Sequence, residues 1–355
     1  FLAPILLYAA LQPVVPERWE SLIAPLILVA LALPALRLVP AMGALLLLLV
    51  GGALVPAGTW LAEGAATIIG DPMFVTGVPT VEDVLLKLLT PAALLGVSLW
   101  LARHRLTWRE SLVGAWTGAA LAGVAAHSLY KQLFAIGSAE QFIALGLAER
   151  TLWEALLLAS AAALWRLGRV KEGAILLGAS LTHFAAYTLL LHNPLWAMQA
   201  VGPWPALNLL PLAYAVPLVA MQALNRVRAV REMGSDRVFN LAWMVLILLF
   251  AASMLRQLFH GSLLVEPGLS QAEDIARSIL AIALAIGFLL WGIRSKERDW
   301  RIGSLVLMLA AVAKVFLWNT QGLEGLTRIA SFVALGFSLI GIGWLYSRQL
   351  APSKA

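Results

Sequence analysis

The chain has 355 residues, of which 61% are hydrophobic and only 12% are charged, and its mean hydropathy is +0.87. A soluble domain carries roughly 25% charged residues, so this composition excludes a water-exposed fold of this size. The net charge of +6 does not indicate a nucleic-acid partner, because the basic residues lie in short segments between apolar runs. The absence of cysteine excludes disulfides, thiolate metal sites and cysteine nucleophiles.

Apolar runs of membrane-spanning length recur along the whole chain. A hydrocarbon core about 30 Å thick is crossed by a helix of about 20 apolar residues. The predicted spans lie at residues 1–12 (partial), 20–38, 41–58, 83–102, 110–131, 151–166, 172–191, 207–224, 238–258, 275–293, 302–318 and 327–346. The sequence therefore predicts an all-α polytopic transmembrane helix bundle, with about 11 complete spans plus a partial first one. We expect residues 1–355 to form a single transmembrane domain, the C-terminal portion of a longer protein, because Phe1 opens inside an apolar run.

The connections between these spans are short, and they alternate in charge. The longest, Pro56 to Val81, is expected to hold a short surface helix, and Ser138 to Ala148 is expected to lie along the membrane interface. One set of alternate loops holds 17 of the 25 basic residues and six acidic ones, a balance of +11, whereas the other set has a balance of −5. Because Lys and Arg mark cytoplasmic loops, the first set and the C-terminus are predicted to be cytoplasmic.

The outward-going helices resemble one another near their outer ends. In residues 125–134, 251–259 and 310–316, a basic residue is followed within three positions by a phenylalanine. Self-similarity of this kind indicates a repeated structural unit. Residues 83–346 are therefore predicted to consist of repeated helical hairpins, each with cations at the outer membrane boundary.

The C-terminal stretch is the most distinctive part of the chain. AKVFL (313–317), GLEGLTRIASF (322–332) and GIGWLY (341–346) resemble the C-terminus of a family of large predicted bacterial membrane proteins, catalogued as domain of unknown function 2339. The family pattern has an acidic residue five positions after the lysine, where this chain has Asn319 after Lys314. The resemblance implies a multi-pass protein of the bacterial inner membrane, and it implies no established chemistry.

Six cations near the outer helix ends are the candidate ligand-binding residues. They are Lys131, Arg150, Arg256, Arg277, Lys314 and Arg328. Arginine suits bidentate binding of phosphate or carboxylate, so a basic cavity shared by these residues would bind an anion. Taken singly, each is more typical of an anchor that holds its helix at the headgroups than of a binding residue, and Lys314 could extend to the headgroups or pair with Glu324.

Glu154, His127 and His183 are weak candidates for catalytic residues, because a glutamate or histidine held within the bundle can act as a general acid or base. The alternatives are an ion pair between Glu154 and Arg150 on one helix face, and packed, hydrogen-bonded histidines. No HxxxH or HExxH spacing is present, so no metal site is predicted. The chain also lacks Walker, GxGxxG and GxSxG motifs, so neither a cofactor nor nucleic-acid chemistry is expected.

These features favour a bacterial inner-membrane protein that binds or transports an anionic envelope ligand in an outward-facing basic cavity. The ligand would be a lipid headgroup or a lipid-linked glycan, and membrane lipids are the expected partners. Two alternatives stay open: a membrane-embedded transferase or hydrolase acting on envelope lipids or glycans, and a non-catalytic scaffold subunit. Whether the protein is an enzyme is therefore left open by the sequence.

Overall fold

A computed structural model of the chain describes residues 2–33, 57–205, 207–227, 236–317, 340–341 and 343–344. These residues are helical or lie in connecting loops, with one isolated antiparallel bridge between Ala200 and Leu263. The helices are α1 (Leu2–Leu11), α2 (Glu17–Glu20), α3 (Ile23–Ala32), α5 (Gly58–Ile68), the 3-10 helix η1 (Val75–Gly77), α6 (Val81–Asp83), the π-helix η2 (Val84–Leu89), α7 (Thr90–Ala102), α8 (Trp108–Phe134), α9 (Ala139–Arg166), α10 (Val170–His183), the π-helix η3 (Phe184–Leu191), α11 (Leu210–Asn225), α13 (Asp236–His260), α14 (Gln271–Arg294) and α15 (Arg298–Leu317). The all-α class is confirmed, while the predicted spans 41–58 and 327–346 lie largely outside the described residues.

Five helical segments among the described residues are long and apolar enough to cross a membrane, and each coincides with a predicted span. They are Val81–Ala102, Trp108–Phe134, Val170–Leu191, Asp236–His260 and Gln271–Arg294. Three of them start at a side-chain cap, provided by Thr80, Thr107 and Ser270. At α8, the Thr107 hydroxyl accepts a hydrogen bond from the Glu110 N–H, and the Glu110 carboxylate accepts one from the Thr107 N–H.

Helix α9 begins earlier than the sequence suggests. The predicted span started at residue 151, with Ser138 to Ala148 along the membrane interface, whereas the structure has one continuous helix from Ala139. The Ser138 hydroxyl accepts a hydrogen bond from the Gln141 N–H at 3.3 Å, which satisfies a backbone donor that the first helical turn leaves free. The polar residues near position 150 therefore lie inside a long helix and not at its start.

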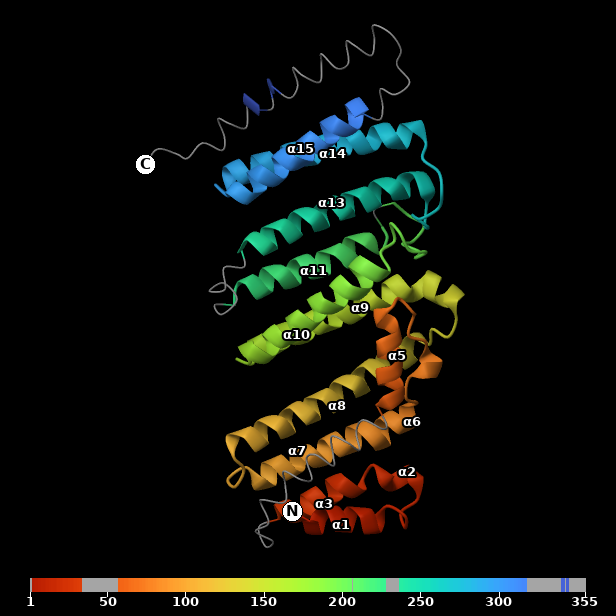
Figure 1. Cartoon of the computed structure of the whole chain (residues 1–355), viewed down its shortest axis with the longest axis vertical. Coiled ribbons are helices and arrows are strands. Elements are labelled where there is room, and N and C mark those ends of the chain that lie inside the picture. The colour runs from red at the N-terminus through yellow and green to blue at the C-terminus, as the bar shows by residue number, and fades with distance from the viewer. Residues whose placement is uncertain are drawn as a thin grey trace, which may run out of the picture. The chain divides into compact units, whose positions relative to one another are not determined.

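The chain divides into two compact units, Phe1–Phe142 and Ile143–Ala355. In the first unit, α3 packs on α7 around the buried Leu28 and Leu95, and α7 packs beside α8. Helix α5 is the short helix expected between Pro56 and Val81, and it is steeply inclined to α7 and α8 (Figure 1).

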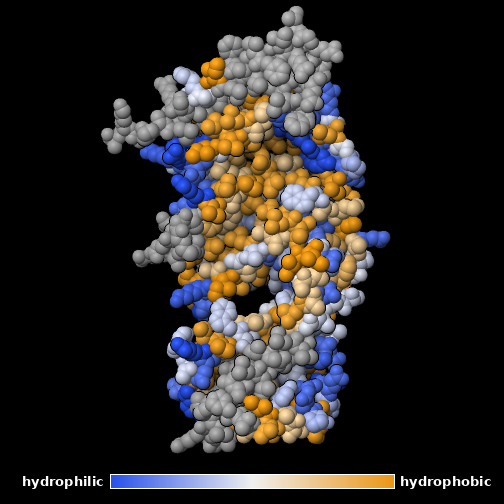
Figure 2. All heavy atoms as spheres, viewed as in Figure 1, coloured by the Kyte–Doolittle hydropathy of each residue, from blue (hydrophilic) through white to orange (hydrophobic). Residues whose placement is uncertain are grey.

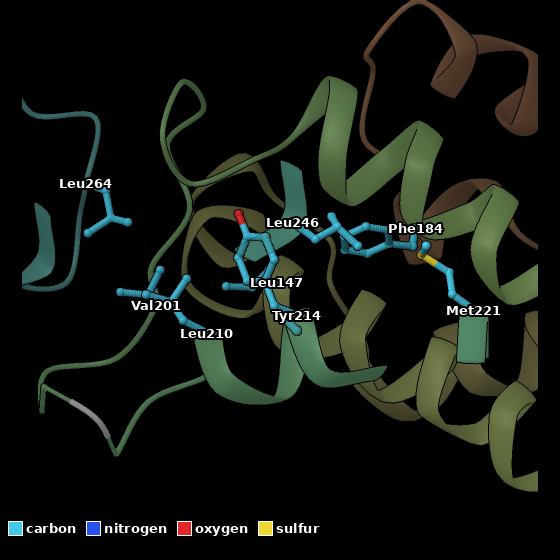
Figure 3. Close-up of a cluster of buried hydrophobic side chains, with 9 residues drawn as sticks. Leu147, Phe184, Val201, Leu210, Tyr214, Met221, Leu246 and Leu264 are labelled. Atoms are coloured by element: carbon cyan, nitrogen blue, oxygen red, sulfur yellow. The ribbon is translucent and has the colours of Figure 1, made fainter. Parts of the chain in front are cut away.

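In the second unit, α10, α11, α13, α14 and α15 pack mainly against their neighbours in the chain (Figure 1). Its largest buried apolar cluster joins α9, η3, α11 and α13 to the segments 192–209 and 261–270, which we call the loop end of this unit. Figure 3 shows the Tyr214 ring among these side chains. The cluster members are Leu147, Phe184, Val201, Leu210, Ala213, Tyr214, Met221, Leu246 and Leu264. The loop end is therefore fixed to the helices by packing.

Glycines let neighbouring helices of this unit approach closely. A Cβ atom on Gly292 of α14 would lie 2.9 Å from the backbone nitrogen of Arg301 on α15. One on Gly303 of α15 would lie 2.3 Å from the sulfur of Met244 on α13. Small residues serve this purpose in membranes, because apolar helices gain little hydrophobic energy from associating in lipid.

The helices expose large apolar side chains, among them Ile279, Leu290 and Val306. Figure 2 shows hydrophobic side chains over the middle parts of the helices, and hydrophilic side chains gather at the helix ends. A soluble fold buries such surface, whereas a lipid bilayer covers it and solvates the polar ends. The distribution is typical of a helical membrane protein.

Candidate functional site

A buried carboxylate near the start of α14 gathers three basic side chains. The Glu273 side chain is 0% exposed, and its Oε1 accepts hydrogen bonds from Arg256 Nη1 at 3.0 Å and from Arg277 Nη2 at 2.6 Å. Its Oε2 lies 2.9 Å from Nε2 of His260. A buried charge is tolerated when partners of opposite charge satisfy it, so Glu273 depends on these three contacts. The contacts join the last turns of α13 to the first turns of α14.

An adjacent ion pair extends this arrangement to α15. Lys314 Nζ lies 2.7 Å from Asp274 Oδ1, and it donates to Ser278 Oγ at 2.9 Å and to the Asp274 carbonyl at 3.1 Å. Glu324, the partner considered from the sequence, lies outside the described residues. Because Glu273 and Asp274 are consecutive, the two sets of contacts form one unit. We call it the cation network, and its members are Arg256, His260, Glu273, Asp274, Arg277 and Lys314.

The cation network carries more positive than negative charge. Arg256, Arg277 and Lys314 outnumber the two carboxylates, so the net charge is +1 with His260 neutral and +2 with His260 protonated. The side chains of Arg277 and Lys314 are 38% and 34% exposed, whereas the Glu273 carboxylate between the helices is buried. The Asp274 side chain beside Lys314 is 25% exposed, so the exposed edge of the network holds two cations and one carboxylate, and its guanidinium and ammonium groups suit an oxyanion.

Four of the six predicted cations also donate to backbone carbonyls near helix ends. The pairs are Lys131 with Met73, Arg150 with His192, Arg256 with Leu264 and Glu266, and Lys314 with Asp274. Met73, Leu264 and Glu266 belong to connecting segments, where carbonyls lack the partners that a helix interior provides. These cations therefore fix loops and helix ends, in addition to any part in binding.

The structure brings three of the six predicted cations together. Arg256, Arg277 and Lys314 belong to the cation network, whereas Arg150 donates to Gln199 Oε1 at 2.8 Å in another part of the second unit. Lys131 is buried in the first unit, and Arg328 lies outside the described residues. A basic pocket shared by all six stays a prediction.

Of the three catalytic candidates, Glu154 and His183 lie in direct contact. His183 Nδ1 is 2.9 Å from Glu154 Oε1, and Thr188 donates to the same oxygen at 3.0 Å. His127 belongs to the first unit, where its Nδ1 accepts a hydrogen bond from Trp60 Nε1 at 2.9 Å. The hydrogen bond between Trp60 and His127 joins α5 to α8, so His127 has a structural role in this unit.

His192 lies close to Arg150, and its ionisation is shifted there. Partial burial lowers the pKa of His192 to about 4, with a further lowering from the nearby Arg150 guanidinium, so this imidazole is neutral at pH 7. No group of three or more His, Asp and Glu side chains in the described ranges is arranged to hold a metal ion.

A cavity of about 510 Å³ opens at the opposite end of the second unit from the cation network. It lies between the end of α11 and the starts of α13 and α15. Its lining residues are Gln222, Asn225, Arg226, Asp236, Asn240, Glu297, Arg298 and Asp299. The cation network is thus a packed cluster at the helix ends, separate from this cavity.

Sequence reasoning missed Glu273 as a partner of the predicted cations. The spacing Ser270-x-x-Glu273 is typical of a helix N-cap, and the Ser270 hydroxyl does accept a hydrogen bond from the Glu273 N–H at 3.1 Å. Besides this spacing, the position of Glu273 one helical turn before Arg277 also indicated an ion pair on one helix face. Thr188 and Gln199 were also missed, because uncharged side chains in an apolar segment give no distinctive pattern.

A family model described as "Predicted membrane protein (DUF2339)" matches residues 1–349, so the similarity extends well beyond the C-terminal motifs. Neither the curated proteins nor the solved structures contain a match to the chain.

Proposed function

From the premise that this chain belongs to the DUF2339 family of predicted membrane proteins, we propose that it binds an anionic lipid headgroup at the cation network. The ligand is an envelope phospholipid or lipid-linked glycan with a phosphate near the membrane surface. The binding residues are Arg277 and Lys314 at the exposed edge, with Arg256 behind them. A lipid held here would contact α13, α14 and α15 at their common end.

The proposal includes the topology on which it depends. About 11 complete spans, built as repeated hairpins, cross the bacterial inner membrane, and the C-terminus is cytoplasmic. Five spans of suitable length and the asymmetry of Lys and Arg between alternate loops support this arrangement. In this topology the cation network faces the periplasmic leaflet, at the depth of lipid phosphates.

The observation that carries the proposal is the excess positive charge of the cation network, together with the exposure of two of its cations. Three cations and a histidine face two carboxylates, so ion pairing within the network leaves one positive charge uncompensated. Exposed cations in the headgroup region attract phosphate, and arginine adds directional hydrogen bonds.

The test is lipid binding by the purified full chain, measured by native mass spectrometry. Phosphatidylglycerol, phosphatidylcholine and inorganic phosphate are titrated separately, so that a lipid headgroup and a free anion can be distinguished. Phosphatidylglycerol should bind best, and replacing both Arg277 and Lys314 by Gln should weaken it about tenfold, or about 1.4 kcal/mol. Arg294→Gln, at the opposite end of α14, is the matched control and should leave binding unchanged.

Other results would favour the alternatives. Equal binding of both lipids by the native chain and the double variant would contradict the proposal and favour the non-catalytic scaffold. Inorganic phosphate binding that equals phosphatidylglycerol binding would favour transport of a soluble anion. Chemical turnover of the bound lipid would favour the membrane-embedded transferase or hydrolase.

A further inference from the structure

A second buried acid has no part in the proposed lipid site. The Glu154 side chain on α9 is 0% exposed, and both hydrogen bonds described above converge on its Oε1. Its Oε2 is buried and makes no hydrogen bond to any part of the chain that the structure describes. An ionised carboxylate in such surroundings is unfavourable unless it is fully paired. Binding a proton removes this cost by making the group neutral.

The partners of Glu154 come from a local distortion of the facing helix. Helix α10 ends at His183, where the π-helix η3 begins, and the His192 N–H donates to the carbonyl of Tyr187, five residues earlier. Residues five apart on an α-helix point about 140° away from each other. The wider π turn brings His183 and Thr188 onto one face, so both reach Glu154.

The two helices are also held in register at this point. The Ser180 hydroxyl donates to the backbone carbonyl of Glu154 at 3.1 Å, which fixes the separation of α9 and α10 next to the acid. His183 has 19% of its side chain exposed, in contrast to the fully buried carboxylate. The imidazole therefore lies between Glu154 and the outside of the helix bundle.

Several other titratable groups among the described residues lie near this site. On α9, Arg150 and Glu149 lie about one turn before Glu154 and are buried. On η3, the Tyr187 ring contacts the His183 ring with centroids 4.9 Å apart. The titratable side chain of α11 is Tyr214, whose hydroxyl accepts from Asn193 and contacts Ser253. The acid and the imidazole are thus the pair that is placed to share a proton.

We infer that Glu154, His183 and Thr188 form a proton-exchange site, in which His183 carries protons between the bundle surface and the buried carboxylate. In one state, the Nδ1–H of neutral His183 donates a hydrogen bond to Oε1 of ionised Glu154. A proton from outside binds Nε2, the Nδ1 proton moves to Oε1, and Glu154 becomes a neutral acid beside a neutral imidazole protonated on Nε2. The reverse sequence releases the proton. Thr188 donates to Oε1 in both states.

The ligand of this site is therefore a proton. Ionisable residues inside membrane proteins mark proton relays and ion pathways, because their burial is otherwise costly. A carboxylate that alternates between charged and neutral forms would couple proton binding to the packing of α9 against α10 and η3.

Infrared difference spectroscopy of the full chain in phosphatidylglycerol vesicles tests this inference. Between about pH 5 and about pH 9, a carboxylic-acid C=O band should appear and disappear in the native chain. The band should be lost in Glu154→Gln and kept in Glu149→Gln, a matched change at the neighbouring buried acid. A pH-dependent band that persists in Glu154→Gln, or native spectra without one, would overturn the inference.

Thr188→Val provides an independent arm if Glu154→Gln does not fold, as judged by circular dichroism. This variant keeps both proton carriers and removes one hydrogen bond that stabilises the ionised carboxylate, so the C=O band should remain and the pH at which it disappears should rise. His183→Phe should make the band insensitive to bulk pH on the time scale at which the native chain responds. If neither variant alters the band, Glu154 is not its source and the inference fails.

Discussion

Replacing Glu273 by Gln should strongly destabilise the second unit, because the carboxylate compensates three basic side chains at once. Glutamine keeps one oxygen acceptor, but it is neutral and its NH2 group faces a donor on the other side. Arg256 and His260 are mostly buried, so both would lose their counter-charge in a poorly solvated place. Breaking a buried ion pair by removing one partner costs about 3 to 5 kcal/mol.

Two details of the structure place the expected loss at the lower end of that range. Arg277 is more than one-third exposed, so water can solvate it after the change, and its share resembles that of a surface pair, about 0 to 1 kcal/mol. Arg256 keeps its bonds to the carbonyls of Leu264 and Glu266. We therefore expect a loss of about 3 kcal/mol, or about a hundredfold in the unfolding equilibrium constant.

The measurement is reversible unfolding of the purified chain in mixed micelles with increasing sodium dodecyl sulfate, followed by circular dichroism. Glu266→Gln is the matched control, because its side chain is exposed and its backbone carbonyl still accepts from Arg256. The control should stay within about 0.5 kcal/mol of the native chain. Equal stability of Glu273→Gln and Glu266→Gln would refute the view that this carboxylate holds α13 and α14 together.

Three further predictions concern other parts of the fold. Gly292→Ala should destabilise the α14–α15 pair by about 1 to 3 kcal/mol in the same assay, whereas Gly287→Ala on α14, whose new methyl group meets open space, should be neutral or stabilising. Lys131→Met should release the segment around Met73 and increase its cleavage by added protease, because a buried carbonyl loses its donor. The pKa of His192 is lower in the folded chain than in the unfolded chain, so its contribution to stability is lost as the pH falls from about 6.5 towards about 4. In His192→Gln, the free energy of unfolding should therefore fall less steeply over this pH range.

The positions of the long helices were predictable because the bilayer imposes a length on every apolar run. The start of α9 was not, because residues 139–150 are too polar to be read as a span and their helical form depends on the serine cap before them. The same limit applies to η3. Its residues are apolar and give no sign of a π turn, and the contacts with Glu154 that accompany it come from a different helix.

The candidate site was predictable in part. The cations could be identified singly, because a charge within an apolar run is conspicuous, and their recurrence near helix ends was visible in the sequence. Their partners could not be identified, because pairing depends on which helix ends meet. Glu273 lies 17 positions after Arg256 and 13 after His260, and the turn of residues 261–270 determines that their side chains meet.

Cations recur near helix ends for a structural reason as well as for any ligand binding, and the sequence alone does not distinguish the two roles. The connections between helices have carbonyls that need donors, and a long basic side chain on the last helical turns can reach them, as Lys131 and Arg256 do. Position alone therefore selects both loop anchors and binding residues. Exposure distinguishes them: Lys131 and Arg150 are buried against their carbonyls, whereas Arg277 and Lys314 keep about a third of their side chains accessible. A phosphate can reach only the second kind, which is why the proposed lipid site is limited to one part of the predicted set.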